Sequence, residues 1–301
     1  MDFAPDPTQQ AVLDAVDVIL RRYAGPERAR EVGEDADAAL LDALSTAGYL
    51  DLFDQPDTGP LTAALVVEAV SRANGRIPVG ARALVGAALL GDEAPERIAL
   101  ATADSTGPVR WAPQAEVILV LDGDDTRVVE PRGVRPVESP FGFPFGLVDL
   151  EGGRGLGPGS GDVLRRWWRV AVAAEMVGAM QGALDHTVRH LTEREQFGKP
   201  LGSLQAIQHR LAEAHVWVEG ARWLVRSAAW QDASGPAAAL AAGHASEAAR
   251  LIGTDMHQLS GAIGFTLEFD LHLWTTRLHA LRLELGGASA HHRDLARAVW
   301  E

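Results

Sequence analysis

The second half of the chain carries an apolar stripe that continues without a break over residues 164–191. Apolar side chains recur in it at steps of three or four residues, which is the repeat of one face of an α-helix. Its members are Leu164, Trp168, Val172, Met176, Met180, Leu184, Val188 and Leu191. A second stripe follows over 204–225, an Ala-rich segment opens at Pro236, and a last helical segment covers about 268–283. Four such segments joined by short links predict an up-and-down four-helix bundle.

The rest of the chain divides into a helical part and a short β-rich part. Helical patterns separated by Gly and Pro occur over about 8–24, 35–48, 60–73 and 79–90. The stretch "AEVILVLDGDDTRVVEP" then places β-branched runs on both sides of an Asp/Gly turn, which predicts a hairpin. We therefore predict a mainly α fold with a small central β region. Its domains are an N-terminal helical domain over 1–100, a reduced β domain over 101–160 and a C-terminal four-helix bundle over 161–301.

Composition excludes several classes of function. The net charge of −14 disfavours a nucleic-acid partner, because phosphates bind clustered Lys and Arg. The chain has no cysteine, so disulfides and thiolate metal sites are ruled out. His291 and His292 are adjacent and would point about 100° apart on a helix, so we predict no metal site there and expect a polar tail. The N-terminus lacks the pattern of a secretory signal, and no apolar run approaches the ~20 residues of a membrane span. We expect a cytoplasmic protein that neither enters a membrane nor binds nucleic acid.

The break between the first two bundle helices, "REQFGKPLGSLQ", contains more polar, charged and aromatic side chains than a turn requires. Glycine and proline at 198, 200 and 202 explain the break itself. It also carries a fixed cation, two amides and an aromatic ring, at Arg194, Gln196, Gln205 and Phe197. An ordinary turn with a solvated arginine is one interpretation. The other is a clamp for an anionic ligand, since a guanidinium offers forked donors to a diphosphate.

A second break, "HQLSGAIGFT", repeats this logic. Gln258 ends a helix there, and Gly261 and Gly264 would let backbone amides approach a ligand. A glycine after a helix is usually a C-cap, so this break alone is weak evidence. Two such breaks in one bundle favour a binding function more than either does.

The stretches "REQFGKPLGSLQAIQHRLAE" and "QLSGAIGFTLEFDLHLWTTR" together resemble the acyl-CoA dehydrogenase family. The helical first third, the central β region and the helical bundle also follow that family's order, so the resemblance covers most of the chain. It implies that Arg194, Gln196, Phe197 and Gln205 form one grip on FAD, and that Gln258, Gly261 and Gly264 form another. In the family both grips reach across a subunit interface to a flavin held mainly by a neighbouring chain. Ala262 stands where the family usually has a second glycine.

The catalytic base of the family is missing from both of its usual places. The family removes an α-proton from an acyl-CoA thioester with a carboxylate, usually in an "E-G-T"-like loop after the last bundle helix. Here that loop reads "LELGGAS", with Leu285 at the expected position. Glu284 is one residue earlier and would point about 100° away on a helix. The alternative place, near the start of the first bundle helix, holds Trp168, and Glu175 lies seven residues further on the same face. We expect Glu284 to be a surface carboxylate at a helix end, and Glu175 to be a partly buried, hydrogen-bonded one.

The middle of the chain is also short for the family. No "T-E-P-x-x-G-S-D"-like flavin loop occurs between Ala99 and Gly157, and "ATADSTGP" is a poor substitute. One hypothesis explains both losses: the chain is a subunit of a hetero-oligomeric, α2β2 acyl-CoA dehydrogenase. A full-length sister subunit would then supply the base and the thioester pocket for an acyl-CoA, for which a sterol side chain is our guess from the family. The alternatives are a self-sufficient homotetramer with Glu284 or Glu175 as base, and a flavin-free structural module. The sequence favours the first hypothesis, because the residue types of both grips are retained.

Overall fold

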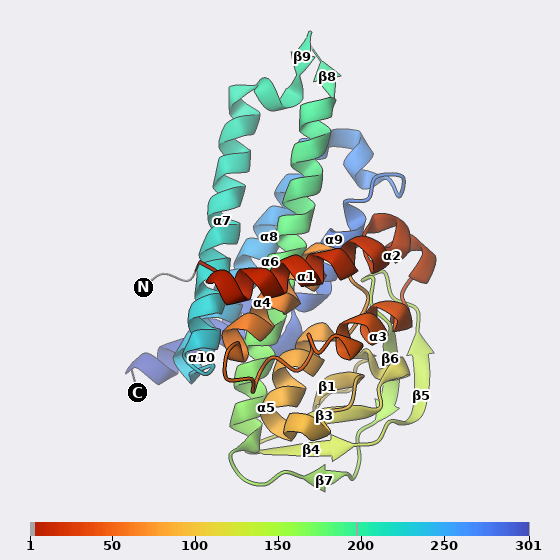
Figure 1. The fold of residues 1–301 in the computed structure, drawn as a ribbon, viewed down its shortest axis with the longest axis vertical. Coiled ribbons are helices and arrows are strands. Elements are labelled where there is room, and N and C mark those ends of the chain that lie inside the picture. The colour runs from red at the N-terminus through yellow and green to blue at the C-terminus, as the bar shows by residue number, and fades with distance from the viewer. Residues whose placement is uncertain (1–3, 197, 301) are drawn as a thin grey trace.

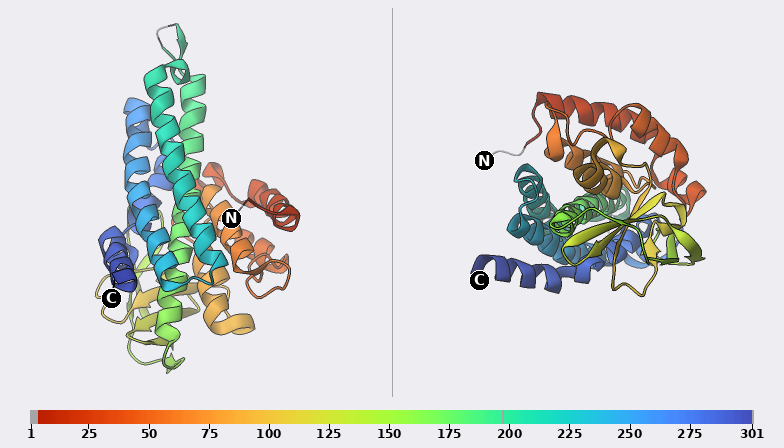
Figure 2. Two further views of the ribbon diagram at one scale, coloured as in Figure 1. Left: turned by 90° about the vertical axis from the view of Figure 1, so that its left-hand side faces the viewer. Right: turned by 90° about the horizontal axis from the view of Figure 1, so that it is seen from below.

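The computed structural model describes residues 4–196 and 198–300. In Figure 1 a tall helical bundle stands above a small β region, and the N-terminal helices cross the front of both. The views in Figure 2 show that the bundle extends well beyond the N-terminal helices at one end and reaches the β region at the other. This mainly helical architecture with a small sheet region confirms the predicted fold class.

The bundle is built around one long central helix. This central helix is α6 (Ser160–Glu193). The other helices of the bundle are α7 (Gln205–Trp230), α8 (Gly235–Ser260), α9 (His272–Leu281) and α10 (Gly287–Trp300). Every residue of α6 from Trp167 to Met180 is buried, not only those of the predicted stripe. A helix that is buried all round needs small residues where neighbours come close. At Gly178 an added Cβ would lie only 2.2 Å from the carbonyl oxygen of Glu68, so the backbone of an N-terminal helix packs directly on α6.

The N-terminal part forms α1 (Pro7–Tyr23), α2 (Pro26–Val32), α3 (Ala38–Thr46) and α4 (Gly59–Arg72). The side chain of Asp6 caps α1 by accepting from the backbone N–H of Gln9, whose side chain accepts from the N–H of Asp6. The pattern over 79–90 predicted one helix, but the chain there forms a π-helical turn, η1 (Ala81–Gly86), followed by α5 (Ala87–Leu90) and the 3₁₀ turn η2 (Gly91–Glu93). The short helix α2 was not predicted.

The β region contains two small sheets. One has the order β1-β3-β4-β7, formed by β1 (Ile98–Thr102), β3 (Val117–Asp122), β4 (Asp125–Val129) and β7 (Arg154–Gly155). The other has the order β2-β6-β5, formed by β2 (Val109–Arg110), β6 (Phe145–Asp149) and β5 (Arg132–Val137). β1 and β3 are parallel, and the predicted hairpin is the antiparallel pair β3 and β4. The predicted division after residue 100 falls inside β1.

The end of the chain differs from the prediction. We expected a polar tail after about residue 283, but 287–300 form the helix α10, which packs against α8. His291 is only 1% exposed, and an added Cβ on Gly243 of α8 would lie 2.6 Å from the ring of His292. The large aliphatic and aromatic residues of α10 are few, and Val299 and Trp300 among them are exposed, so this helix is stabilised by the tertiary contact and not by a long apolar stripe.

Candidate functional site

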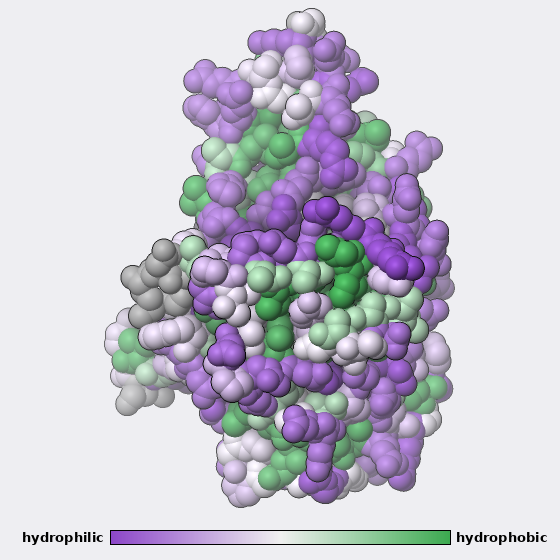
Figure 3. Space-filling view, viewed as in Figure 1, coloured by the Kyte–Doolittle hydropathy of each residue, from purple (hydrophilic) through white to green (hydrophobic). Residues whose placement is uncertain are grey.

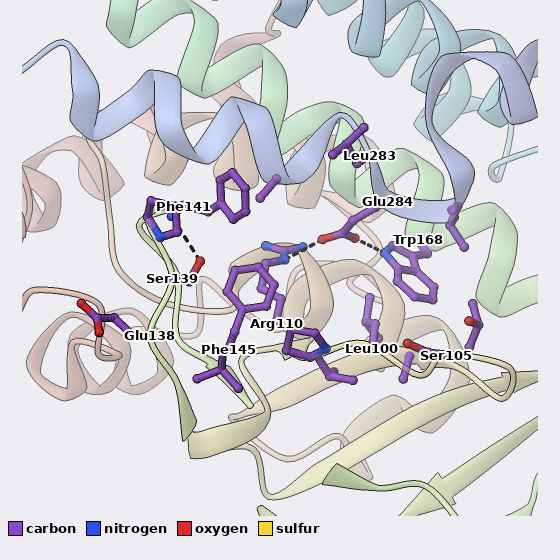
Figure 4. A pocket seen from close by; sticks show the side chains of 18 residues that line it. Leu100, Ser105, Arg110, Glu138, Ser139, Phe141, Phe145, Trp168, Leu283 and Glu284 are labelled. Atoms are coloured by element: carbon purple, nitrogen blue, oxygen red, sulfur yellow. Dashed lines mark hydrogen bonds and ion pairs between the residues drawn. The ribbon is translucent and has the colours of Figure 1, made fainter. Parts of the chain in front are cut away.

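A cavity of about 460 Å³ lies where the β region meets the bundle. Its wall is mostly apolar and includes Leu100, Val109, Phe141, Phe145, Leu283 and Leu285, and its polar lining includes Thr102, Ser105 and Glu138. Figure 4 shows Arg110, Glu284 and Trp168 lying in a row along the cavity, joined by dashed lines. Strands β1 and β2, the start of α6 and the end of α9 therefore converge on one site.

Arg110 holds two carboxylates at once. Its Nη1 lies 2.6 Å from Oε2 of Glu175, and its Nε lies 2.6 Å from Oε1 of Glu284. Glu175 also accepts from the backbone N–H of Gly80, at 3.3 Å from its Oε1. The indole N–H of Trp168 donates to Oε2 of Glu284. Both oxygens of each carboxylate are therefore engaged by donors of the protein.

The predicted exposure of Glu284 is wrong. Its side chain is only 16% exposed and lines the cavity. The prediction treated Glu284 as part of a continuous helix, but α9 ends at Leu281 and Glu284 opens a separate 3₁₀ turn, η6 (Glu284–Gly286). Leu285 has a φ of 52° inside that turn, so the angular argument for a helix does not apply to its neighbour. Glu175 is hydrogen-bonded as predicted, and it is fully rather than partly buried.

Burial and charge act on these groups together. Burial would lower the pKa of Arg110, but Glu175 and Glu284 raise it above its ordinary value. Burial raises the pKa of Glu284; the positive charge of Arg110 opposes this rise, and the negative charge of the nearby Glu175 adds to it. No pattern in the sequence singled out Arg110. Its partners are 65 residues away at Glu175 and further still at Glu284, and no local pattern signals such a pairing.

The two positions that the family resemblance singled out for a base line this same cavity. They are Leu285, in the turn after α9, and Trp168, near the start of α6. Neither side chain can take up a proton from a substrate. Among the described residues that line the cavity, two carry carboxylates: Glu284, which Arg110 holds, and Glu138. Glu175, the second partner of Arg110, does not line the cavity.

The first group of predicted FAD contacts lies at the other end of the bundle. Arg194 is the C-cap residue directly after α6, Gln196 lies in the hairpin of β8 (Glu195–Gln196) and β9 (Lys199–Pro200), and Gln205 begins α7. All three are exposed. The hairpin is the tip of the molecule in Figure 1, and hydrophilic residues cover this tip on the face drawn in Figure 3. Phe197, the aromatic member of the predicted group, lies outside the described residues.

The second group follows the end of α8. Gln258 and Gly261 are exposed, and Gly261 has a φ of 67°, which favours glycine. Gly264 lies in the 3₁₀ turn η5 (Gly261–Phe265) and is buried, and an added Cβ on it would meet Cβ of Ser260 at 2.9 Å. Gly264 is therefore required by close packing within the turn.

His257 ties this turn to the bundle. Its Nδ1 lies 2.7 Å from the carbonyl oxygen of Gly264, and its Nε2 lies 2.8 Å from Oγ1 of Thr275 in α9. A carbonyl oxygen only accepts, so Nδ1 carries a proton and donates. Helices α7 and α8, which carry Gln205 and Gln258, are joined by a 2.6 Å ion pair between Arg210 and Asp255.

Among residues 4–196 and 198–300, no helix combines the length and the apolar content that crossing a membrane requires. Within the same residues, no group of three or more His, Asp or Glu side chains is arranged to hold a metal ion.

Comparison with known sequences gives one consistent family. The family described as "Acyl-CoA dehydrogenase, C-terminal domain" matches residues 166–299. The acyl-CoA dehydrogenase IpdE2 of Mycolicibacterium smegmatis is 27% identical, over 97% of this chain and 99% of its own length. IpdE2 of Mycobacterium tuberculosis is 38% identical, over 44% of this chain and 41% of its length.

Comparison with solved structures gives the same fold. A chain of the ChsE4-ChsE5 complex from Mycobacterium tuberculosis superimposes with a TM-score of 0.87 at 24% identity, over 100% of this chain and 99% of that one. A chain of the steroid ACAD Tcur3481-Tcur3483 superimposes with a TM-score of 0.80 at 24% identity, over 97% of both chains. At this level of identity the likeness concerns the fold.

Proposed function

Because this chain belongs to the acyl-CoA dehydrogenase family, we propose that it is one subunit of a hetero-oligomeric, FAD-dependent acyl-CoA dehydrogenase. The enzyme removes hydrogen from the α and β carbons of an acyl-CoA thioester. In this proposal the present chain contributes contacts to FAD across a subunit interface. A full-length sister subunit, in an α2β2 assembly, contributes the catalytic base and the thioester pocket.

The observation that carries the proposal is that both candidate bases, Glu175 and Glu284, are bound to Arg110. A general base must be free to receive a proton from the substrate. Glu175 and Glu284 are instead both bound to Arg110 at 2.6 Å, and their remaining oxygens accept from Gly80 and Trp168. This arrangement argues against the self-sufficient homotetramer, which needs one of these residues as its base.

The residues at the far end of the bundle fit a flavin dinucleotide. Arg194 provides a fixed positive charge for a diphosphate, and the amides of Gln196, Gln205 and Gln258 can bind polar edges. They are exposed, so they are available to a ligand on a neighbouring chain. FAD, when bound, accepts the hydride that the reaction releases. A flavin-free structural module would have no use for this set of polar groups at two breaks of one bundle.

Two of the similar solved structures support a partner subunit and a steroid substrate. The ChsE4-ChsE5 structure is described as a complex of two differently named chains, and Tcur3481-Tcur3483 is described as a steroid ACAD. We infer that the present chain also pairs with a different chain. We further infer that the acyl group of the enzyme's acyl-CoA substrate belongs to a steroid side chain.

The visible absorption spectrum tests this proposal. The chain is purified alone, and then as a complex with the full-length acyl-CoA dehydrogenase encoded beside it. We expect the lone chain to be colourless and the complex to be yellow, with about one FAD per pair of chains. A lone chain that holds stoichiometric FAD, bleached by an acyl-CoA, would overturn the proposal in favour of the homotetramer.

A further inference from the structure

We propose that the cavity between the β region and the bundle is a non-catalytic binding site for a neutral, ring-bearing apolar molecule. The proposal rests on the proposed function only in taking this cavity to be free of flavin. It assigns a ligand class to a site in which Glu284 is already bound to Arg110 and Trp168.

The shape and wall of the cavity suit a ring system. Its volume of about 460 Å³ falls in the range of about 300–1,000 Å³ typical of small-molecule sites. Three aromatic rings contribute to the wall, from Phe141, Phe145 and Trp168. Phe141 and Phe145 meet edge to face, with ring centroids 6.4 Å apart, and Figure 4 shows Phe145 beside Arg110. Flat apolar ligands gain from such offset and edge contacts in addition to the area that they bury.

The polar groups on the floor of the cavity, Glu284 and Trp168, do not need a hydrogen bond from a ligand. Glu284 receives Arg110 on one oxygen and Trp168 on the other, so its hydrogen bonds are complete without a ligand. The indole N–H of Trp168 is used in the same contact. An apolar ligand can therefore cover this floor without breaking a hydrogen bond, and loses nothing by having no polar group there.

The charge around the cavity disfavours anions. Arg110 is the one cation among the described lining residues, and two carboxylates neutralise it. Glu138 adds a further negative charge to the lining. A phosphate-bearing ligand such as CoA or FAD would meet repulsion here, whereas a neutral molecule would not.

Two dyes with the same ring system test this inference. N-phenyl-1-naphthylamine is neutral, and 1-anilinonaphthalene-8-sulfonate is its anionic relative; both fluoresce more strongly in an apolar site. We expect the neutral dye to saturate at about one per chain, and the sulfonate to bind at least tenfold more weakly. Equal binding of the two dyes would overturn the charge argument and with it the proposal.

Variants identify the site of binding. Ala280→Phe adds a ring inside the cavity, and we expect it to lower the affinity for the neutral dye at least tenfold. The control is Ala212→Phe, which adds the same ring on the exposed face of α7 and should change nothing. If Ala280→Phe does not fold, Leu283→Trp narrows the cavity from a residue that is 59% exposed, and the same loss of binding is expected. Dye binding that survives a folded cavity variant would overturn the proposal.

The outcomes also separate this inference from the proposed function. A colourless lone chain that fails to bind the neutral dye contradicts only the present inference. A yellow lone chain whose flavin is displaced by the dye contradicts the proposed function as well, because the cavity would then be a flavin site.

Discussion

Arg110 and Glu284 form an ion pair, with 2.6 Å between Nε and Oε1, that joins strand β2 to the turn after α9. Both side chains are largely shielded from solvent, at 10% and 16% exposure. The same guanidinium holds Glu175 of the central helix, so a single cation connects the β region, the start of the bundle and its last turn.

Arg110→Met should therefore be strongly destabilising. It would leave two buried carboxylates without a counter-charge, and breaking a buried pair in this way costs about 3–5 kcal/mol. The free energy of unfolding from urea denaturation measures the effect. The matched control is Arg132→Met, since Arg132 and Glu130 are each 80% exposed, and it should change stability by less than about 0.5 kcal/mol. Similar values for the two variants would show that Arg110 does not organise the cavity.

His291 should make the fold sensitive to mild acid. Burial lowers the pKa of His291 to about 4, whereas in the unfolded chain it titrates near the usual ~6.5. Between these values the unfolded chain binds the proton first, so stability is retained above about pH 6.5 and falls as the pH drops toward 4. The loss should be about 3 kcal/mol. His291→Leu should flatten this part of the curve, and His209→Leu, on the exposed face of α7, should leave it unchanged. A curve that is equally steep in both variants would contradict this assignment.

Arg194→Gln should lower the affinity of the complex for FAD without affecting the fold. Losing a charge-assisted contact to a diphosphate costs about 1.5–3 kcal/mol, so the dissociation constant of FAD should rise at least tenfold. The thermal midpoint of the lone chain should not move, because Arg194 is exposed. Arg189→Gln, an exposed change on the same helix, is the control. If both variants retain FAD like the unaltered complex, the proposed grip is wrong.

His257 should position the second grip through its Nδ1 contact. Asn at this position can place its side-chain N–H where Nδ1 of the histidine was, whereas the longer Gln places its amide nearer to the former position of Nε2. We expect His257→Asn to keep FAD affinity within about threefold and His257→Gln to lose about tenfold, because the carbonyl of Gly264 then lacks its donor. Thr275→Val removes only the partner of Nε2 and should resemble His257→Asn. Equal loss in the Asn and Gln variants would indicate a general effect on folding.

Two buried helix glycines should respond in opposite directions to alanine. Gly178→Ala would force a Cβ to within 2.2 Å of the carbonyl oxygen of Glu68, and overpacking of this kind costs about 1–3 kcal/mol. Gly253 of α8 has no atom within 4 Å of an added Cβ, so Gly253→Ala should stabilise by about 0.5–1 kcal/mol. Thermal unfolding of the two variants compares them directly. A neutral result for Gly178→Ala would mean that α4 and α6 can move apart.

Local patterns account for what could be predicted. The stripe over 164–191 indicated α6, because helical periodicity needs only the spacing of apolar residues. The hairpin of β3 and β4 followed from its turn residues in the same way. The exposed positions of Arg194, Gln196, Gln205 and Gln258 agree with their occurrence at breaks between helices. Their role in binding FAD stays a prediction.

The cavity could not be predicted from the sequence. The sequence by itself determined the long helices, the hairpin and the absence of a base at Leu285 and Trp168, since each depends on residues close together in the chain. Only the tertiary structure decided that Glu284 turns inward, that α10 packs on α8, and that Arg110 lies between two carboxylates. Those outcomes depend on pairs far apart in the chain. A charge such as that of Arg110 is paired with a carboxylate, and not solvated, only because the β region packs against the bundle.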